Sequence, residues 1–378
     1  MTATSHTEVA KRLLANVDAG TSDQSEGGMK VPAAYYRDPA QWAREMDRIF
    51  RRSPLIVGLS CDFREPGAFD ALTIAGRPIL VVRGDDGVLR SFLNICRHRG
   101  APVAEGCGQA RRFTCPYHAW SYDPNGRLVG VPGRDTFGDL DVAGLIELPT
   151  HELKGVVLAV LTPDLDFDPA AWMSGMEDAL EMLRLDDLHR YPVVTELESP
   201  NWKIAADGYV DGYHIGYLHS TTIGLKAITN RNTYDFFGPH VRIGFANKVI
   251  TTLRDLPEAE WPLAQAMSMV HYVFPNISIS GQPYGSLMVS RLLPGPTPDR
   301  STTVQYHYHR EPVVGEEAVL AAEARRKLYA DVTGDEDFAT GFKIMAALDA
   351  LGDDSFRYGR NERGNQNFHT WIARIVDG

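Results

Sequence analysis

The chain has 378 residues, of which 44% are hydrophobic and 23% charged, an ordinary globular composition with room for about two or three domains. Lysine and arginine number 38 against 49 aspartates and glutamates, so the formal net charge is −11, which disfavours binding to nucleic acid. The longest clean apolar stretch, residues 156–161, is too short to cross a bilayer, and 4 cysteines are too few for a disulfide scaffold. We expect a cytoplasmic protein with no nucleic-acid or membrane partner.

The first fifty or so residues hold two different patterns. Residues 1–31 end in a stretch rich in glycine, serine and aspartate, which predicts a flexible lead-in. Asp38 and Pro39 then form an N-cap and first-turn pair, and apolar side chains follow at the spacing of one helical face. We therefore expect a helix within residues 32–52 that packs on the C-terminal domain.

The rest of the chain divides near residue 164. Residues 53–164 are rich in short apolar runs, with Asp86-Gly87 as a hairpin signal, so we expect a small all-β domain. Residues 165–378 mix helical and alternating patterns, which predicts an α+β domain around an antiparallel sheet. Its helices are expected over residues 170–185, 203–219, 315–332 and 335–351, and its strands over residues 240–253 and 270–309.

The β-domain carries two motifs that suit a metal site. Cys96 and His98 form a C-x-H motif, and after sixteen further residues Cys115 and His118 form a C-x2-H motif. A zinc ribbon would bind one ion with all four side chains. A Rieske [2Fe–2S] cluster would take the cysteines on one iron and the histidines on the other, which raises its reduction potential above that of an all-cysteine cluster. The mixed order of the first pair is unusual for zinc and favours the cluster.

A second group of candidate ligands lies in the helix expected over residues 203–219. His214 and His219 are five residues apart, so a regular α-helix would leave them about 140° apart around its axis. A π-type turn, or a break near Gly216, would let both imidazoles reach one metal ion. Asp211 precedes His214 by three residues, from where its carboxylate can accept the distal N–H of that imidazole. A histidine pair on a helix can also be purely structural.

Together the two groups resemble a known family. The segments CRHRGAP (residues 96–102) and CPYHAW (residues 115–120), and the N-W-K block followed by D-x-x-H-x4-H from Asp211, are similar to Rieske non-haem iron oxygenases, the catalytic α-subunits of the aromatic-ring-hydroxylating family. The resemblance extends from about Asp38 to the closing segment 368–371. It implies an α+β fold, with an N-terminal all-β Rieske [2Fe–2S] domain ahead of a helix-grip (START-like) catalytic domain, and a mononuclear Fe(II) as second cofactor.

The resemblance assigns ligands residue by residue. The residues concerned are Cys96, His98, Cys115 and His118 for the cluster, His214, His219 and Asp337 for the Fe(II), and Asp211 as a catalytic carboxylate. In the family, the residue matching Asp211 links the Fe(II)-binding His214 to a cluster histidine of a neighbouring subunit, here His118. The family pattern is altered at Ala119, where glycine is usual, and at Asp207, where glutamate is common. Neither change removes a ligand.

Two aspartates compete for the place of the third iron ligand. In the family this ligand is the Asp of a Glu-Asp pair that opens a long helix. Glu336-Asp337 fits because an apolar-periodic helix follows it and Leu348 takes the family's leucine place, although two other positions of the pattern differ. Asp354 is the alternative, with a partial match further along and no helix expected after it.

The resemblance implies an oxygenase that uses O2 to hydroxylate an aromatic or similar apolar organic substrate, by ring dioxygenation or monohydroxylation. Electrons would come from a separate reductase or ferredoxin, because the chain has no nucleotide-binding glycine motif. The active unit is expected to be a homotrimer, with or without a β-subunit. Oxidative N- or O-demethylation is the alternative reaction, and a zinc-ribbon ligand-binding protein is the alternative without catalysis.

Wall residues of the substrate pocket are predicted from their place near the histidines and in the expected sheet. They are Asp207, Val210, Tyr217, Asn276 and Ile279. The shape of the pocket, rather than the ligand set, is expected to choose among these reactions.

Overall fold

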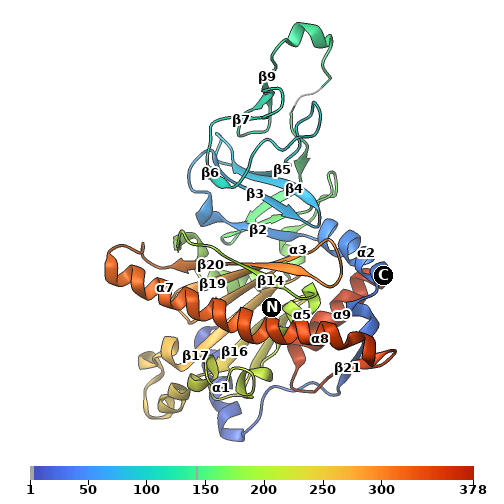
Figure 1. Ribbon diagram of the computed structural model, residues 1–378. Coiled ribbons are helices and arrows are strands. Elements are labelled where there is room, and N and C mark those ends of the chain that lie inside the picture. The colour runs from blue at the N-terminus through green and yellow to red at the C-terminus, as the bar shows by residue number, and fades with distance from the viewer. Residues whose placement is uncertain (1–3, 142–143) are drawn as a thin grey trace. The chain divides into compact units, whose positions relative to one another are not determined.

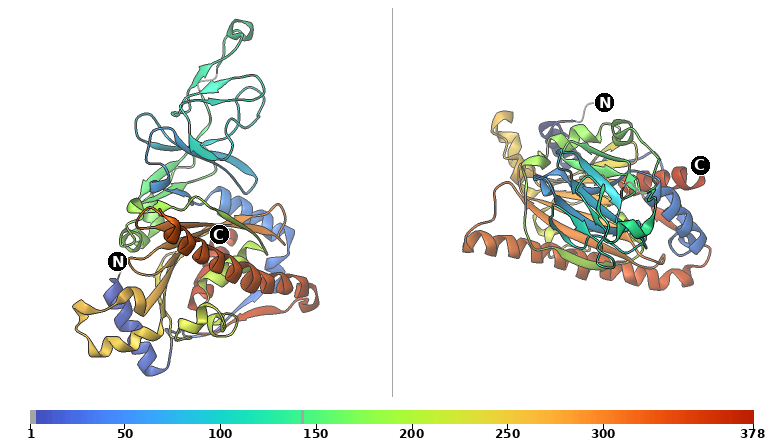
Figure 2. Two further views of the ribbon diagram at one scale, coloured as in Figure 1. Left: turned by 60° about the vertical axis from the view of Figure 1, so that its left-hand side comes forward. Right: turned by 90° about the horizontal axis from the view of Figure 1, so that it is seen from above.

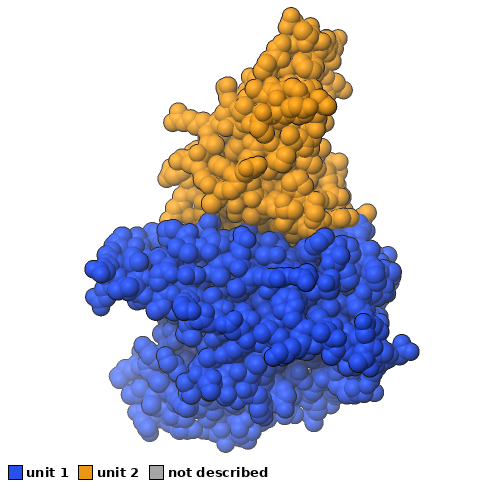
Figure 3. All heavy atoms as spheres, in the orientation of Figure 1, with its two compact units in different colours: residues 1–49, 173–378 blue, residues 50–172 orange. Residues whose placement is uncertain are grey.

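The computed structural model describes residues 4–141 and 144–378, which fold into two compact units (Figure 3). One unit, residues 50–172, consists mainly of short strands, and the other combines residues 1–49 with residues 173–378 and is mixed α and β. The fold class expected from the sequence, a β-domain ahead of an α+β domain with an antiparallel sheet, is confirmed. No helix of the described chain is long and apolar enough to span a membrane.

Three antiparallel sheets build the β unit. The five-stranded sheet has the order β10 (Glu147–Leu148), β5 (Leu89–Leu93), β4 (Arg77–Arg83), β3 (Ala68–Ile74) and β6 (Cys107–Gln109). The two three-stranded sheets are β11 (Thr150–Leu153), β12 (Val156–Ala159) and β2 (Leu55–Leu59), and β7 (Phe113–Thr114), β8 (Ser121–Tyr122) and β9 (Leu128–Gly130). The hairpin predicted at Asp86-Gly87 joins β4 to β5, and Gly87 has a φ of 79°, which glycine adopts without strain.

One eight-stranded antiparallel sheet is the centre of the α+β unit. Its order is β13 (His189–Arg190), β20 (Ser301–His309), β19 (Leu287–Pro294), β18 (Ile277–Gly281), β17 (Met267–Val273), β16 (His240–Ala246) and β15 (Thr233–Phe237), with β14 (Thr195–Ser199) also paired to β20. A separate ribbon pairs β1 (Met29–Pro32) with β21 (Ser355–Tyr358). The strand run expected over residues 240–253 ends at Ala246, and a 3-10 helix, η8 (Lys248–Asp255), replaces its second half.

The α+β unit also holds most of the helices (Figures 1 and 2). The α-helices of the chain are α1 (His6–Ala19), α2 (Pro39–Glu45), α3 (Pro169–Met173), α4 (Met176–Glu181), α5 (Trp202–Val210), α6 (Leu263–Ala266), α7 (Glu316–Asp331), α8 (Ala339–Leu351) and α9 (Arg363–Asp377). Asp38 caps α2 as expected, since its side chain accepts the N–H of Ala40. The π-helical segment η10 (Val332–Phe338) joins α7 to α8, so that the three form one long rod across the unit (Figure 1).

Strand alternation gives the eight-stranded sheet two different faces. Cross-strand pairing places Val270, Ser280 and Met288 in one row, on the face over which α5 packs. The alternate residues of the same strands, among them Met269, point the other way and pack with α1. The sheet is therefore covered by helices on both faces, and the row with Met288 is available to line a site beneath α5 and the long rod.

Part of the flexible lead-in expected over residues 1–31 is instead helical and packed: residues 6–19 form α1. α1 buries Val9, Ala10 and Leu13, which join the apolar cluster that includes Met269. The expectation was drawn from local composition, and it is wrong for residues 6–19 because the apolar side of this short helix finds its partner on a strand more than two hundred residues away.

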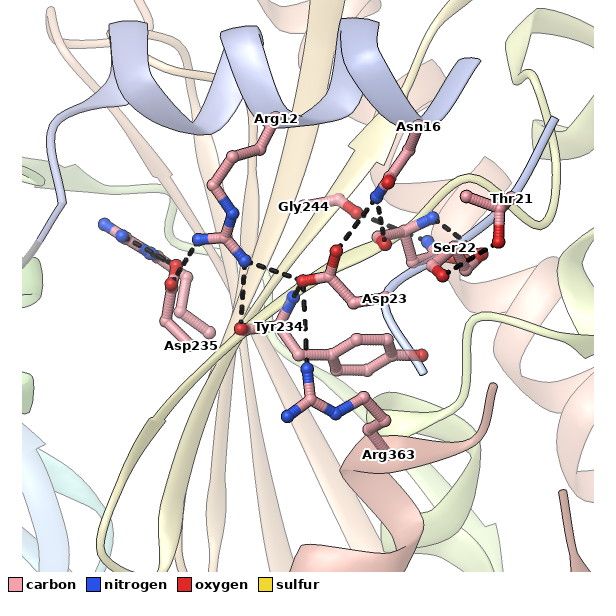
Figure 4. A network of polar contacts seen from close by, with 11 residues as sticks. Arg12, Asn16, Thr21, Ser22, Asp23, Tyr234, Asp235, Gly244 and Arg363 are labelled. Carbon is pink, nitrogen blue, oxygen red and sulfur yellow. Dashed lines mark hydrogen bonds and ion pairs between the residues drawn. The ribbon is translucent and has the colours of Figure 1, made fainter. Parts of the chain in front are cut away.

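A polar network anchors the glycine-rich stretch that follows α1 (Figure 4). The Arg12 guanidinium donates to Asp23 at 2.7 Å and also to Asp235 on β15, and Asn16 donates to Asp23 at 3.0 Å. Asp23 also accepts the backbone N–H of Tyr234 at 3.0 Å. This carboxylate therefore ties the stretch after α1 to the edge of the sheet.

Candidate metal centres

Three of the side chains singled out from the sequence converge on one point of the α+β unit. Nε2 of His214 lies 3.1 Å from Nε2 of His219. Oδ1 of Asp337 lies 3.0 Å from Nε2 of His219 and 3.5 Å from Nε2 of His214. One ligand atom from each side chain falls within 4.8 Å of the others. Two imidazole nitrogens and one carboxylate oxygen are the donor set of a mononuclear Fe(II) site with open positions, so these residues fit that metal.

A carboxylate holds each imidazole at its Nδ1 atom, on the side opposite the converging Nε2 atom. Nδ1 of His214 is 3.0 Å from Oδ2 of Asp211, and Nδ1 of His219 bonds to Oε2 of Glu336. Thr222 donates its hydroxyl to the same Glu336 oxygen at 3.0 Å. Because a carboxylate occupies each Nδ1, each Nε2 keeps its lone pair for a metal ion. The spacing of the sequence predicts the Asp211 contact, but sequence reasoning missed Glu336, which comes near His219 only in the folded chain.

The backbone explains how two histidines five residues apart can meet. α5 ends at Val210. The next residue, Asp211, has an extended backbone with φ −97° and ψ 124°, and a separate 3-10 turn, η6 (His214–Gly216), follows. The expected helix over residues 203–219 therefore stops after Val210, before the break expected near Gly216. A Cβ on Gly216 would lie 2.7 Å from Oγ1 of Thr229, so this turn packs too closely for a side chain.

The third ligand comes from the π-helical segment η10. A π turn widens the helix, and here the adjacent residues Glu336 and Asp337 both reach the histidines. The helix expected from residue 335 does not begin there, because α7 continues through η10 into α8. Asp354, the alternative ligand, pairs with Arg357 at 2.9 Å among exposed side chains. It lies outside the converging group, which consists of His214, His219 and Asp337.

In the β unit, the two candidate cysteines belong to one buried cluster and the two candidate histidines contact each other. Cys96 and Cys115 are free thiols, 2% and 3% exposed. The rings of His98 and His118 have centroids 4.5 Å apart, and their Nδ1 atoms are buried with no hydrogen-bond partner within the described chain. Buried polar atoms are normally paired, so two orphaned histidine nitrogens and two buried thiols fit a bound [2Fe–2S] cluster.

Aromatic side chains surround this group. Trp120 stacks on His98 with ring centroids 5.0 Å apart. The Tyr122 hydroxyl accepts the backbone N–H of Arg97 at 2.9 Å and lies 3.4 Å from Sγ of Cys96, so its own proton can be donated to that sulfur. Sequence reasoning missed Tyr122. Its contact with the sulfur matters because hydrogen bonds to ligand sulfurs are one of the means by which proteins tune the reduction potentials of clusters. Ala119 has a φ of 57°, the left-handed region where glycine carries no steric cost.

A cavity of about 710 Å³, here called the main cavity, opens beside the converging group. His214, His219 and Asp337 border it at one place. Further wall residues come from the sheet face described above and from the long rod, and include Phe245, Ser268, Val270, Ser280, Gln282, Met288, Arg325, Leu328 and Tyr329. Mainly apolar walls with a few polar groups are typical of a site for a small organic molecule.

A second cavity, of about 500 Å³, also borders the converging group and includes Asp207. The Asp207 carboxylate lies 3.1 Å from the hydroxyl of Tyr36, 2.9 Å from that of Tyr358 and 2.9 Å from Nε2 of His369. These partners are buried, so the carboxylate is committed to a structural network.

The five wall residues predicted from the sequence lie mostly elsewhere. Asp207 borders the second cavity and not the main one. Val210 and Asn276 are fully buried and Tyr217 is 66% exposed, and none of these three borders either cavity. Ile279 is also fully buried, on the sheet face turned away from the main cavity, because side chains alternate along β18.

Two family models match the chain. Residues 53–151 match the Rieske [2Fe-2S] domain, and residues 185–378 match the catalytic domain of the ring-hydroxylating alpha subunit. The chain therefore belongs to the ring-hydroxylating α-subunit family of Rieske oxygenases. The cofactors of this family are a [2Fe–2S] cluster and a mononuclear iron, which decides against the zinc-ribbon interpretation of the β unit.

Individual relatives cover different reactions. The glycine betaine monooxygenase oxygenase subunit of Chromohalobacter salexigens is 31% identical over 201 residues, 52% of this chain and 44% of that protein. The biphenyl 2,3-dioxygenase subunit alpha of Rhodococcus jostii is 36% identical over 206 residues, 51% of this chain and 43% of that protein. The chain thus spans about half the length of the curated relatives it matches. A solved quaternary ammonium Rieske monooxygenase shares the fold, with a TM-score of 0.80 at 18% identity and 100% of both chains covered.

Proposed function

We propose that this chain is the catalytic subunit of an oxygenase that uses O2 to hydroxylate an aromatic or similarly apolar organic substrate. The observation that carries the proposal is the convergence of His214, His219 and Asp337 at the wall of a largely apolar cavity of about 710 Å³. An Fe(II) held by His214, His219 and Asp337 would supply O2 activation, and a [2Fe–2S] cluster would supply single electrons. A separate reductase or ferredoxin is the source of those electrons.

The chain's own residues prepare this site. Asp211 and Glu336 accept the Nδ1 protons of the two histidines and so direct both Nε2 atoms to one point. Val270 and Met288 form part of the apolar wall, where burial of a substrate contributes about 25 cal/mol per Å² of apolar surface removed from water. The shape and apolar surface of the substrate thereby hold it beside the converging metal-ligand side chains.

Metal and sulfide analysis tests the site. The wild-type chain is expected to hold about three irons and about two acid-labile sulfides. Asp337→Asn should hold about two irons with unchanged visible absorbance, because only the mononuclear site loses a ligand. Asp354→Asn, the matched change at a surface carboxylate, should keep all of its iron. Iron loss in Asp354→Asn with full retention in Asp337→Asn would reverse the assignment.

Oxidative N- or O-demethylation is the second candidate, and the names of some relatives support it. Proteins named for glycine betaine and for quaternary ammonium compounds are similar to this chain, alongside a biphenyl dioxygenase. The main cavity has aromatic walls at Tyr209, Phe245 and Tyr329. Aromatic faces bind both flat rings and methylated ammonium groups, so both reactions suit these walls.

Product analysis separates the two reactions. The enzyme would be reconstituted with a surrogate reductase and given ¹⁸O2 with a panel of aromatic and N-methyl compounds. Hydroxylation places the label on the substrate ring, whereas demethylation releases formaldehyde and an unlabelled amine or alcohol. Oxygen consumption that yields neither product with any compound would contradict both candidates.

We also propose that the active unit is a homotrimer. In it, Asp211 of one subunit links the iron site of that subunit to a cluster histidine of the neighbouring subunit, as the family resemblance implies. A solved quaternary ammonium Rieske monooxygenase is described in terms of inter-subunit electron transfer. Mixed complexes of Cys96→Ser chains and Asp337→Asn chains should then regain product formation that neither variant shows alone. Electron transfer confined to one chain would leave the mixture as inactive as its parents.

A further inference from the structure

α7 presents three successive cations, and one of them has no acidic partner. Arg326 pairs with Glu323 at 2.9 Å, and Lys327 pairs with Asp331 at 2.8 Å, both along the same helix. Arg325 borders the main cavity instead. Among the described residues no carboxylate lies within ion-pair distance of Arg325. Its charge is therefore presented to the cavity rather than neutralised on the helix.

The guanidinium of Arg325 is only partly hydrogen-bonded. Nη2 donates to the backbone oxygen of Ser286 at 3.3 Å, and the guanidinium carbon lies 5.2 Å from the centre of the Tyr329 ring. Nε is buried and has no hydrogen-bond partner in the described part of the chain. A buried N–H without an acceptor costs free energy, so this part of the cavity is suited to an acceptor oxygen of a ligand.

The surroundings leave this charge uncompensated. His307 stands opposite Met288 in the sheet, is 2% exposed, and has no partner for either ring nitrogen within the described chain. Burial, together with the charge of Arg325, lowers the pKa of His307 to about 4, so the imidazole is neutral near pH 7. Two acids border the cavity: Asp337 belongs to the converging group, and Asp211 holds Nδ1 of His214. Lys226 is a second cation on the cavity wall.

We propose that Arg325 binds a carboxylate of the substrate, which makes the substrate an apolar organic acid. The carboxylate lies at α7, and the carbon to be oxidised faces His214, His219 and Asp337. A guanidinium matches the planar carboxylate with two parallel N–H bonds. This inference rests on the proposed oxygenase function and adds the substrate class to it.

Benzoate and benzamide, which share shape and differ in charge, test the proposal by calorimetric titration of the iron-loaded protein. Wild type should bind benzoate about 10-fold or more tightly than benzamide, because only benzoate pairs with the guanidinium. Arg325→Gln should weaken benzoate by about 10- to 100-fold and leave benzamide nearly unchanged. Arg326→Gln, the same change one residue further on, is the matched control and should keep the wild-type preference.

Arg325→Lys keeps the charge without the planar fork, and its benzoate affinity should lie between those of wild type and Arg325→Gln. Unchanged iron content and visible absorbance show that each variant is folded. Equal binding of both probes by wild type, no benzoate binding by wild type, or unchanged benzoate affinity in Arg325→Gln and Arg325→Lys would overturn the assignment. Probe binding needs no turnover, so a chain that oxidises no substrate yet prefers benzoate would contradict only the oxygenase function.

Discussion

At the scale of single residues, the two imidazoles of the iron site are held by carboxylates from very different places in the chain. Asp211 lies three residues before His214, whereas Glu336 lies 117 residues from His219. Each carboxylate fixes the tautomer and the orientation of its ring, which raises the basicity of the nitrogen that faces the metal. The distant partner therefore performs the same positioning as the local one.

Removal of Glu336 is expected to weaken the mononuclear iron site. Glu336→Ala should lower iron affinity by about 10- to 100-fold, because Nδ1 of His219 loses its acceptor, and Glu336→Gln, whose amide oxygen can still accept, should lose less. Iron retained against a graded series of chelator concentrations measures the effect, with cluster absorbance as the internal reference. Asp335→Ala, a change at the exposed neighbour, is the control. Equal iron retention in Glu336→Ala and Asp335→Ala would remove Glu336 from the site.

At the scale of elements, the long rod depends on how α8 lies against the start of α5. A Cβ on Gly341 of α8 would come within 2.6 Å of Cγ of Pro200, a ring that cannot swing aside. A Cβ on Gly334, within η10, would meet nothing closer than a side-chain carbon of Leu197 at 3.6 Å, an ordinary contact. Two glycines of one rod therefore differ sharply in the room around them.

This difference predicts opposite outcomes for one substitution. In an exposed helix alanine is more favourable than glycine by about 1 kcal/mol. Gly341→Ala should nevertheless lower the unfolding temperature, because overpacking against Pro200 costs about 1–3 kcal/mol. Gly334→Ala should leave the unfolding temperature unchanged or raise it. Thermal unfolding followed by circular dichroism measures both variants, and equal losses would contradict the packing explanation.

At the scale of the whole molecule, buried histidines couple stability to pH. Burial, with a smaller effect of Arg242, lowers the pKa of His6 to about 4 and that of His271 to about 3. His307 has a pKa of about 4 for the reasons given above. The usual pKa of histidine is 6.5. Below that pH these imidazoles bind protons in the unfolded chain but stay neutral in the folded chain until the pH approaches their lowered pKa values. Their contribution to stability is present above pH 6.5 and is lost as the pH falls toward the folded values.

The free energy of unfolding should therefore fall with decreasing pH, by about 1.4 kcal/mol per pH unit for each of these histidines. Urea unfolding at about pH 7.5, 6.5 and 5.5 measures the slope. His271→Gln should reduce the slope, whereas His151→Gln, at a partly exposed histidine, should not. In the metal-free chain His219 acts in the opposite sense: burial opposes its charge, but Asp337 and Glu336 raise its pKa, so its contribution is lost as the pH rises. A slope unchanged in His271→Gln would contradict the prediction.

The sequence by itself determined the features that depend on short spacings. The motifs at Cys96 and Cys115, the histidine pair with Asp211, and the two-residue period of the strands all involve neighbours in the chain, and a local pattern records such neighbours directly. The fold class and the family could be predicted for this reason, because each follows from several local patterns in a fixed order.

Only the tertiary structure decided which distant residues meet. It brought Asp337 rather than Asp354 to the histidines, added Glu336, packed α1 on the sheet, and turned Arg325 into the main cavity while leaving Ile279 on the opposite face. These contacts join segments many residues apart, and they depend on where a long helix crosses a sheet and which face each strand presents. No local periodicity carries that information, since one periodic pattern is compatible with several ways for a helix to cross a sheet.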